Sequence, residues 1–325
     1  MFKELFAKKQ HDTNLRTKRN IYLLFSILIG LLLIFPEDIT WARDRLSYLE
    51  YASSSWTIMQ RYINSGIFSF FSNEPLFLTI NIILSSFLVP ENVVKCIIFT
   101  STIGVLYSLG KITKYNFLIL LFFLLVPQVV KNHVIHLRQG LALSIYLLGL
   151  VSNKKYGGLL RCLSIFIHTS FVFLILFEFL EIILKRVKFT FTVRILLSSI
   201  FLTIFIQAIP VLASLFEDRR AQAYDFTMAE GSSGLGFLAW LFVGSLFILV
   251  TKKDYINTIT CYGILFYLMS YFLLDFSARI FENIIPLILI GVLSIQSKYT
   301  RTLFIMFFIL YSSLIWYLSG FSFLI

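Results

Sequence analysis

The chain has 325 residues, of which 58% are hydrophobic and 14% are charged, and its mean hydropathy is +0.85. This composition excludes a soluble globular domain of that length. The formal net charge of +11 does not indicate nucleic acid, because basic cytoplasmic loops explain it in a membrane protein. Apolar runs recur from residue 21 to the C-terminus, so the sequence predicts an all-α polytopic membrane protein with one integral domain over residues 1–325.

About eleven transmembrane helices are predicted after a basic cytoplasmic tail of residues 1–19. The run Leu76–Leu88 is too short for a full crossing, because 13 residues make about 20 Å of helix against a hydrocarbon core of about 30 Å. We interpret it as a re-entrant or half-depth helix on the outer side. The full spans are expected at about 20–36, 92–110, 115–131, 139–152, 158–168, 170–184, 189–216, 234–251, 255–275, 280–296 and 302–320.

The distribution of basic residues predicts the orientation. With the N-terminus in the cytoplasm, the lysine-rich loops near residues 111–114, 154–155, 185–188, 252–253 and 298–301 all fall inside, as the positive-inside rule requires. Two outer loops follow, an amphipathic one over 37–75 and a second over 217–233. Arginine dominates the few basic residues left outside: Arg43, Arg45, Arg61, Arg138, Arg219, Arg220 and Arg279. Arginine suits bidentate recognition of phosphate.

The first outer loop carries two acidic candidates, Asp44 and Glu74, and several aromatic residues that include Tyr48. Aromatic rings stack on sugars and carboxylates accept sugar hydroxyls, so this composition favours a carbohydrate site. The alternative is an interfacial amphipathic helix with an aromatic belt, which we expect for the middle of the loop.

Arg138 begins an apolar helix on the outer side, next to Gln139 and Gly140. An arginine there can be an anchor whose side chain reaches the membrane surface. The neighbouring glutamine and glycine argue against an anchor, because they add polarity and allow a close backbone approach. We therefore expect Arg138 to bind an anion.

His168 lies at a predicted turn between two short helices, in the sequence FIHTSF. A histidine among apolar residues is often a core residue whose hydrogen bonds are satisfied. An ionisable group within a membrane protein is also a functional candidate, and histidine commonly transfers protons.

The second half of the chain adds four candidates. Arg219, Arg220 and Tyr224 lie in the long polar loop, where the alternative is a solvated charge cluster. Arg279 lies near the outer end of a span, and it can instead pair with Asp275 one helical turn earlier.

No metal or cofactor is expected. The three cysteines stand singly in apolar segments, and no pair has the spacing of a metal site. The chain also has no HExxH motif and no D-x-D with supporting ligands.

Taken together, these segments resemble the EpsG family of polysaccharide polymerases, related in function to Wzy-type polymerases of O-antigen and capsule. The similarity extends over about residues 40–290, and RQGLA followed by a histidine some 30 residues later is its most specific part. The matching pieces are Asp44 to Tyr48 with Tyr51, Glu74 to Phe77, Arg138 to Ala142, His168 to Ser170, Arg219 and Arg220 with Tyr224, and Arg279 with Ile280.

The resemblance implies a metal-independent glycosyltransferase with a GT-C-like fold in the bacterial plasma membrane. Its substrates would be undecaprenyl-diphosphate-linked oligosaccharide repeat units at the outer face. A membrane protein that regulates chain length is an expected partner, and nucleic acid is not expected. On this hypothesis Arg138, Arg219, Arg220 and Arg279 bind diphosphate, Tyr224 and Tyr48 help to bind substrate, and His168, Glu74 or Asp44 performs acid–base work and orients the acceptor.

Two other functions stay open. One is a glycosyltransferase that uses sugars linked to undecaprenyl phosphate, or a ligase that moves finished glycan to another acceptor. The other is a flippase or transporter of the lipid-linked unit. Transporters usually contain internal repeats, whereas this sequence shows none and places its polar residues on one face.

Overall fold

The computed structural model describes residues 2–35, 42, 44–215, 234–274 and 276–319. These residues form helices and connecting turns with no strand among them, which confirms the predicted all-α class. The elements are α1 (Phe2–Ile34), α2 (Arg45–Asn64), α3 (Ile67–Ser72), α4 (Pro75–Ser85), α5 (Pro90–Ile112), α6 (Leu118–Leu125), α7 (Pro127–Val134), α8 (Leu137–Val151), α9 (Lys154–Leu163), the 3-10 helix η1 (Ser164–Phe166), α10 (Phe171–Arg186), α11 (Phe191–Leu215), α13 (Leu235–Val250), α14 (Tyr255–Ser270), α15 (Ser277–Glu282), α16 (Ile285–Ser294) and α17 (Lys298–Ser319).

Four of these helices are long and apolar enough to cross a membrane, within α1, α5, α11 and α17, and α7 with α8 make a fifth if the bent pair is one span. This supports a multi-pass membrane protein. The other predicted spans form shorter helices, so the count of eleven stays a prediction. The predicted half-depth segment forms α4, whose 11 residues are also too short to cross. The basic tail is helical and continuous with the first span, since α1 begins at Phe2.

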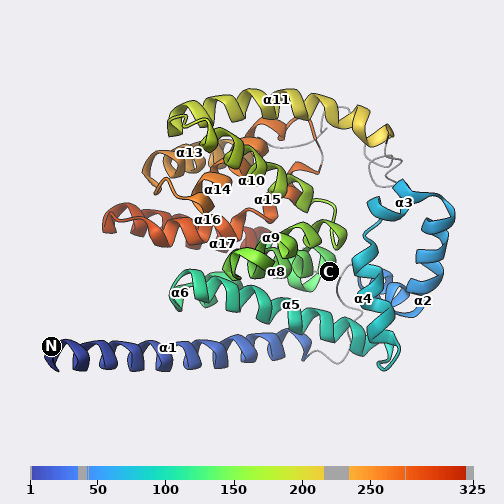
Figure 1. Cartoon of the computed structure of the whole chain (residues 1–325), viewed down its shortest axis with the longest axis horizontal. Coiled ribbons are helices and arrows are strands. Elements are labelled where there is room, and N and C mark those ends of the chain that lie inside the picture. The colour runs from blue at the N-terminus through green and yellow to red at the C-terminus, as the bar shows by residue number, and fades with distance from the viewer. Residues whose placement is uncertain (1, 36–41, 43, 216–233, 275, 320–325) are drawn as a thin grey trace.

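The long helices run along the longest axis of the molecule (Figure 1). Helix α1 lies beside α5 along one edge, α11 follows the opposite edge, and α2 to α4 gather at one end. Apolar side chains on the outer helices face away from the protein. Leu32 of α1, Phe242 of α13 and Leu310 of α17 each expose more than half of their surface, as expected of side chains that contact lipid.

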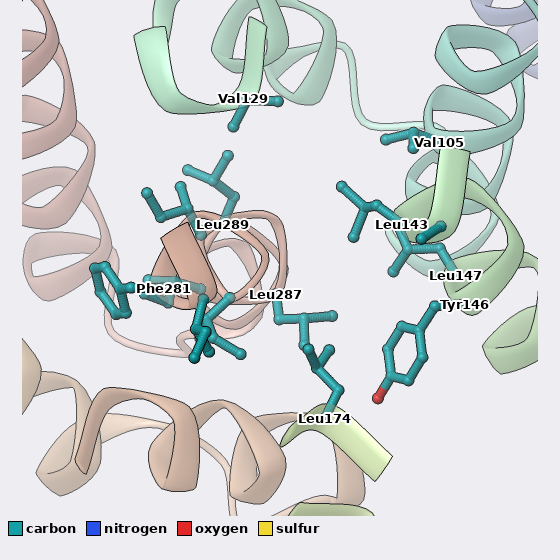
Figure 2. Close-up of a cluster of buried hydrophobic side chains, with 14 of the residues drawn as sticks. Val105, Val129, Leu143, Tyr146, Leu147, Leu174, Phe281, Leu287 and Leu289 are labelled. Carbon is teal, nitrogen blue, oxygen red and sulfur yellow. The ribbon is translucent and has the colours of Figure 1, made fainter. Parts of the chain in front are cut away.

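The core lies where α5, α8, α10 and α16 meet. Figure 2 shows Val105, Leu143, Leu174 and Leu287 converging from these helices. Helices α5 and α8 cross closely at Gly104, where a Cβ would lie 2.0 Å from the Ser144 hydroxyl oxygen. A small residue at such a crossing lets two backbones approach within a membrane protein.

Two buried carboxylates one turn apart on α10 join neighbouring helices. Glu178 accepts hydrogen bonds from Arg161 of α9 at 2.9 Å and from the Tyr146 hydroxyl of α8 at 2.8 Å. Glu181 pairs with Arg194 of α11 and accepts from the Tyr262 hydroxyl of α14 at 3.0 Å. Each carboxylate has a cation and a phenol as partners, which is the arrangement that a buried charge requires.

Candidate functional site

The predicted outer ends of several helices meet at a sharp bend between α7 and α8. The sequence predicts one span over 115–131, but Pro127 separates α6 from α7, because proline cannot donate the hydrogen bond that would continue a helix. After α7 the axis turns by 106° into α8. The bend leaves carbonyl groups at the end of α7 without helical partners. Arg45 of α2 supplies one partner, since its Nη2 donates to the Val134 carbonyl at 2.7 Å.

Gly140 permits the close approach of α7 and α8 behind the bend. A Cβ at this position would lie 2.1 Å from the Asn132 carbonyl oxygen and 3.2 Å from His133 Nδ1. The first contact is with backbone, so it cannot be relieved by turning a side chain. The sequence RQGLA therefore needs its glycine for the geometry that positions Arg138.

Arg138 is held in place by a carboxylate and three aromatic rings. Its Nη1 donates to Glu74 Oε2 at 2.9 Å and to the Tyr51 hydroxyl at 3.3 Å. Its guanidinium carbon lies 5.8 Å from the centre of the Tyr48 ring, 5.1 Å from Tyr51 and 5.9 Å from Phe77, distances at which cation–π attraction contributes. These contacts exceed what a surface anchor needs.

The two charged partners differ in access. The Glu74 side chain is 2% exposed, whereas the Arg138 side chain is 21% exposed. Glu74 occupies the left-handed backbone region at φ 59° directly before α4, where Pro75 starts the helix. A non-glycine residue in this region requires support from its surroundings. Of the two charged groups, the arginine is therefore the more accessible.

A chain of hydrogen bonds connects the start of α8 to His168. Gln139 Nε2 donates to the Arg279 carbonyl at 2.6 Å and to Asn283 Oδ1 at 2.8 Å. Asn283 Nδ2 donates to the Ser170 hydroxyl at 3.1 Å, and this oxygen lies 2.7 Å from His168 Nδ1. Residues from three distant segments thus share one network.

The network also defines the tautomer of His168. The backbone N–H of Ser170 donates to His168 Nδ1 at 3.2 Å. An N–H can only donate, so Nδ1 is the acceptor and the proton of the neutral ring lies on Nε2. In this state Nε2 carries the ring proton and is a hydrogen-bond donor.

A second carboxylate, Glu282 of α15, lies close to two residues at the bend. Lys131 Nζ is 3.3 Å from Glu282 Oε1, and His136 Nδ1 is 3.3 Å from Glu282 Oε2. Lys131 belongs to α7, and His136 is the residue directly before α8. The Lys131–Glu282 ion pair therefore joins α7 to α15, whereas His136 Nδ1 lies near the same carboxylate without a hydrogen bond to it.

Arg45 is a further cation at this site. It is 3% exposed, its Nε and Nη1 are buried without a partner among the described residues, and it forms no ion pair with a described carboxylate. Burial lowers the pKa of the Arg45 guanidinium to about 10, an effect that Tyr48 opposes. The group stays charged at neutral pH and adds positive potential behind Tyr48.

The structure brings together Tyr48, Glu74, Arg138 and, through backbone or network contacts, Arg279 and His168. Asp44 lies apart from these contacts: its side chain is exposed and bonds to no described residue, although its backbone at φ 65° begins α2. Arg219, Arg220 and Tyr224, together with Asp275, lie outside the described residues.

Sequence reasoning missed Arg45, Glu282 and Asn283 as members of the site. Arg45 follows Asp44 directly in the sequence and is one of the predicted outer arginines, so these two facts could have indicated that it belongs to the site. Glu282 and Asn283 follow Arg279 within one turn, so the helical period puts them near it. Among the described residues, no three His, Cys, Asp or Glu side chains cluster as metal ligands.

The family model described as "EpsG family" matches residues 10–324 of this chain. Comparisons with curated proteins and with solved structures each give no match.

Proposed function

The chain belongs to the EpsG family, which is associated with polysaccharide polymerases, and on this premise we propose the reaction that it performs. It joins undecaprenyl-diphosphate-linked oligosaccharide repeat units at the outer face of the bacterial plasma membrane. The growing glycan leaves its lipid diphosphate and is transferred to a sugar hydroxyl of the next lipid-linked unit.

The observation that carries this proposal is the setting of Arg138. A diphosphate gains negative charge when its bond to the anomeric carbon breaks, and a fixed cation nearby lowers the energy of that step. Glu74 and the Tyr51 hydroxyl both bond to Nη1 of Arg138, and the Arg138 side chain is 21% exposed. The start of α8 lies directly before it, and a helix N-terminus also favours anions.

The reaction balances without a cofactor. The bond between the anomeric carbon and a diphosphate oxygen breaks, and the acceptor oxygen forms a new bond to that carbon. The acceptor proton passes to a base or to the released diphosphate. We assign Glu74 to positioning Arg138, since its carboxylate is 2% exposed. Asp44 has an exposed carboxylate, so it is our candidate base for the acceptor hydroxyl.

The other predicted residues complete the proposal. His168 donates from Nε2 to a phosphate or sugar oxygen, in the tautomer that Ser170 favours. Tyr48 supplies a ring beneath Arg138. Arg219, Arg220 and Arg279 bind diphosphate, and Tyr224 contacts sugar or diphosphate. We further propose that the protein has eleven spans in a GT-C-like architecture and a cytoplasmic N-terminus, that it needs no metal, and that a chain-length regulator is its partner.

A deletion strain tests the function. We expect it to accumulate single lipid-linked repeat units on the outer face and to display at most one unit per acceptor. Complementation with the intact gene should restore long chains. A strain whose lipid-linked unit is not made would identify an earlier transferase, and a strain whose unit stays on the cytoplasmic face would identify a flippase.

A further inference from the structure

A pocket of about 960 Å³ lies at the other end of α8 from Arg138. Gly149 and Ser152 line it, and Gly149 is 11 residues beyond Arg138, which corresponds to about 17 Å along the helix. Its walls come from the ends of four distant segments, near residues 112–116, 149–161, 252–257 and 290–301. These include four of the five lysine-rich loops that the sequence predicts on the cytoplasmic face.

The pocket is strongly basic. Lys114, Arg161, Lys252 and Arg301 line it, against the single carboxylate of Asp254. Arg161 is neutralised by Glu178 at 2.9 Å. Lys114, Lys252 and Arg301 form no ion pair with a described carboxylate. Three cations in one concavity attract an anion more strongly than isolated surface lysines do.

A buried amide and an apolar wall complete the pocket. Asn257 is 2% exposed and lines the pocket; its Nδ2 donates to Asp254 Oδ2 and to the Lys252 carbonyl, each at 3.0 Å. Its Oδ1 is buried without a partner among the described residues; this oxygen can only accept a hydrogen bond, so it suits a headgroup hydroxyl and not a phosphate oxygen. Leu150, Ile290 and Leu293 form apolar lining. The pocket therefore has cations that can bind a negative charge and, next to them, an apolar wall that can contact hydrocarbon.

We propose that this pocket binds the phosphate headgroup of an anionic membrane lipid. The cations take the phosphate, and the apolar wall takes the start of an acyl chain. Basic pockets between helices on the cytoplasmic side suit such headgroups, and each nearby cation contributes by attraction to the negative leaflet. A soluble phosphate would use the cations but leave the apolar wall exposed. This lipid site is separate from the proposed polymerisation site.

Native mass spectrometry of the full-length protein tests the proposal by counting bound lipids while phosphatidylglycerol is titrated. Phosphatidylcholine with the same acyl chains is the neutral comparison. We expect one phosphatidylglycerol to bind in preference to phosphatidylcholine. The double substitution Lys252→Gln with Arg301→Gln should weaken its binding about 30-fold, the effect of two nearby cations.

The matched control is Lys185→Gln with Arg186→Gln, which removes the same charge from the exposed end of α10. We expect this control to bind phosphatidylglycerol like the unchanged protein. Equal loss in both double variants, or equal binding of the two lipids, would overturn the proposal. Displacement of the lipid by millimolar inorganic pyrophosphate would overturn it in favour of a soluble phosphate. The readout is lipid binding, so it stands or fails independently of polymerisation.

Discussion

If the ion pair between Arg138 and Glu74 holds the guanidinium in place for a diphosphate, substitutions at both residues should slow polymerisation by amounts that can be estimated. Arg138→Lys keeps the charge but loses the planar group that can contact Glu74, Tyr51 and a diphosphate together. We expect a loss of roughly 2–4 kcal/mol in transition-state stabilisation, which is about 30- to 1,000-fold in rate. Glu74→Gln removes the charge-assisted bond at 2.9 Å, and should cost roughly 2 kcal/mol, or about 30-fold.

The double variant distinguishes two roles for Glu74. If Glu74 acts only by positioning Arg138, the double variant should be about as slow as Arg138→Lys alone, since the second change removes nothing further. If Glu74 contacts substrate independently, the two losses should multiply. Chain-length distributions on gels, normalised to membrane protein levels, provide the measurement. Arg61→Lys and Glu91→Gln, both exposed, are controls that should make normal polymer. Multiplying losses, or full-length polymer from Arg138→Lys, would refute the positioning role.

Three further predictions concern Gly140, His168 and the orientation of the chain in the membrane. Gly140→Ala should lower the melting temperature and membrane level of the protein, because overpacking costs about 1–3 kcal/mol and the obstructing atom is backbone; Gly158→Ala, with no atom within 4 Å of its Cβ, should not. His168→Gln keeps a donor near the position of Nε2 and should retain more polymer than His168→Ala, for which we expect about a 100-fold loss; equal loss in both would argue against a donor. In a background that lacks Cys96, Cys162 and Cys261, Ser53→Cys should react with an impermeant thiol reagent in intact cells and Asn153→Cys should not; the reverse would invert the topology.

The sequence predicted individual helices better than the contacts between them. Each predicted apolar run contains a helix, and the short α4 was anticipated from the length of its run, but the predicted spans 115–131 and 280–296 are each divided into two helices. The break at Pro127 was missed, because the apolar run continues through it and hides the loss of one backbone donor. Helix length and hydropathy report on local structure, so they say little about how helices bend against one another.

Candidate residues were predicted singly, whereas their partners were not. Arg138 and Glu74 are 64 residues apart, and no periodic pattern connects positions at that separation. Arg45 was grouped with the outer arginines, but its contact with the end of α7 depends on a bend that the sequence did not predict. Asp44 and Glu74 looked alike in the sequence. Packing distinguishes them, since one carboxylate is exposed and the other is buried against a guanidinium.

The two carboxylates of α10 also affect how the protein enters the membrane. An unpaired charge costs several kcal/mol in the hydrocarbon core, and the partners of Glu178 and Glu181 come from α9 and α11 on either side. We therefore expect α9, α10 and α11 to enter the lipid together with both ion pairs already formed, because this avoids the cost of an unpaired charge. A substitution at Glu178 or Glu181 would then reduce the amount of inserted protein while leaving the turnover of each surviving molecule largely intact.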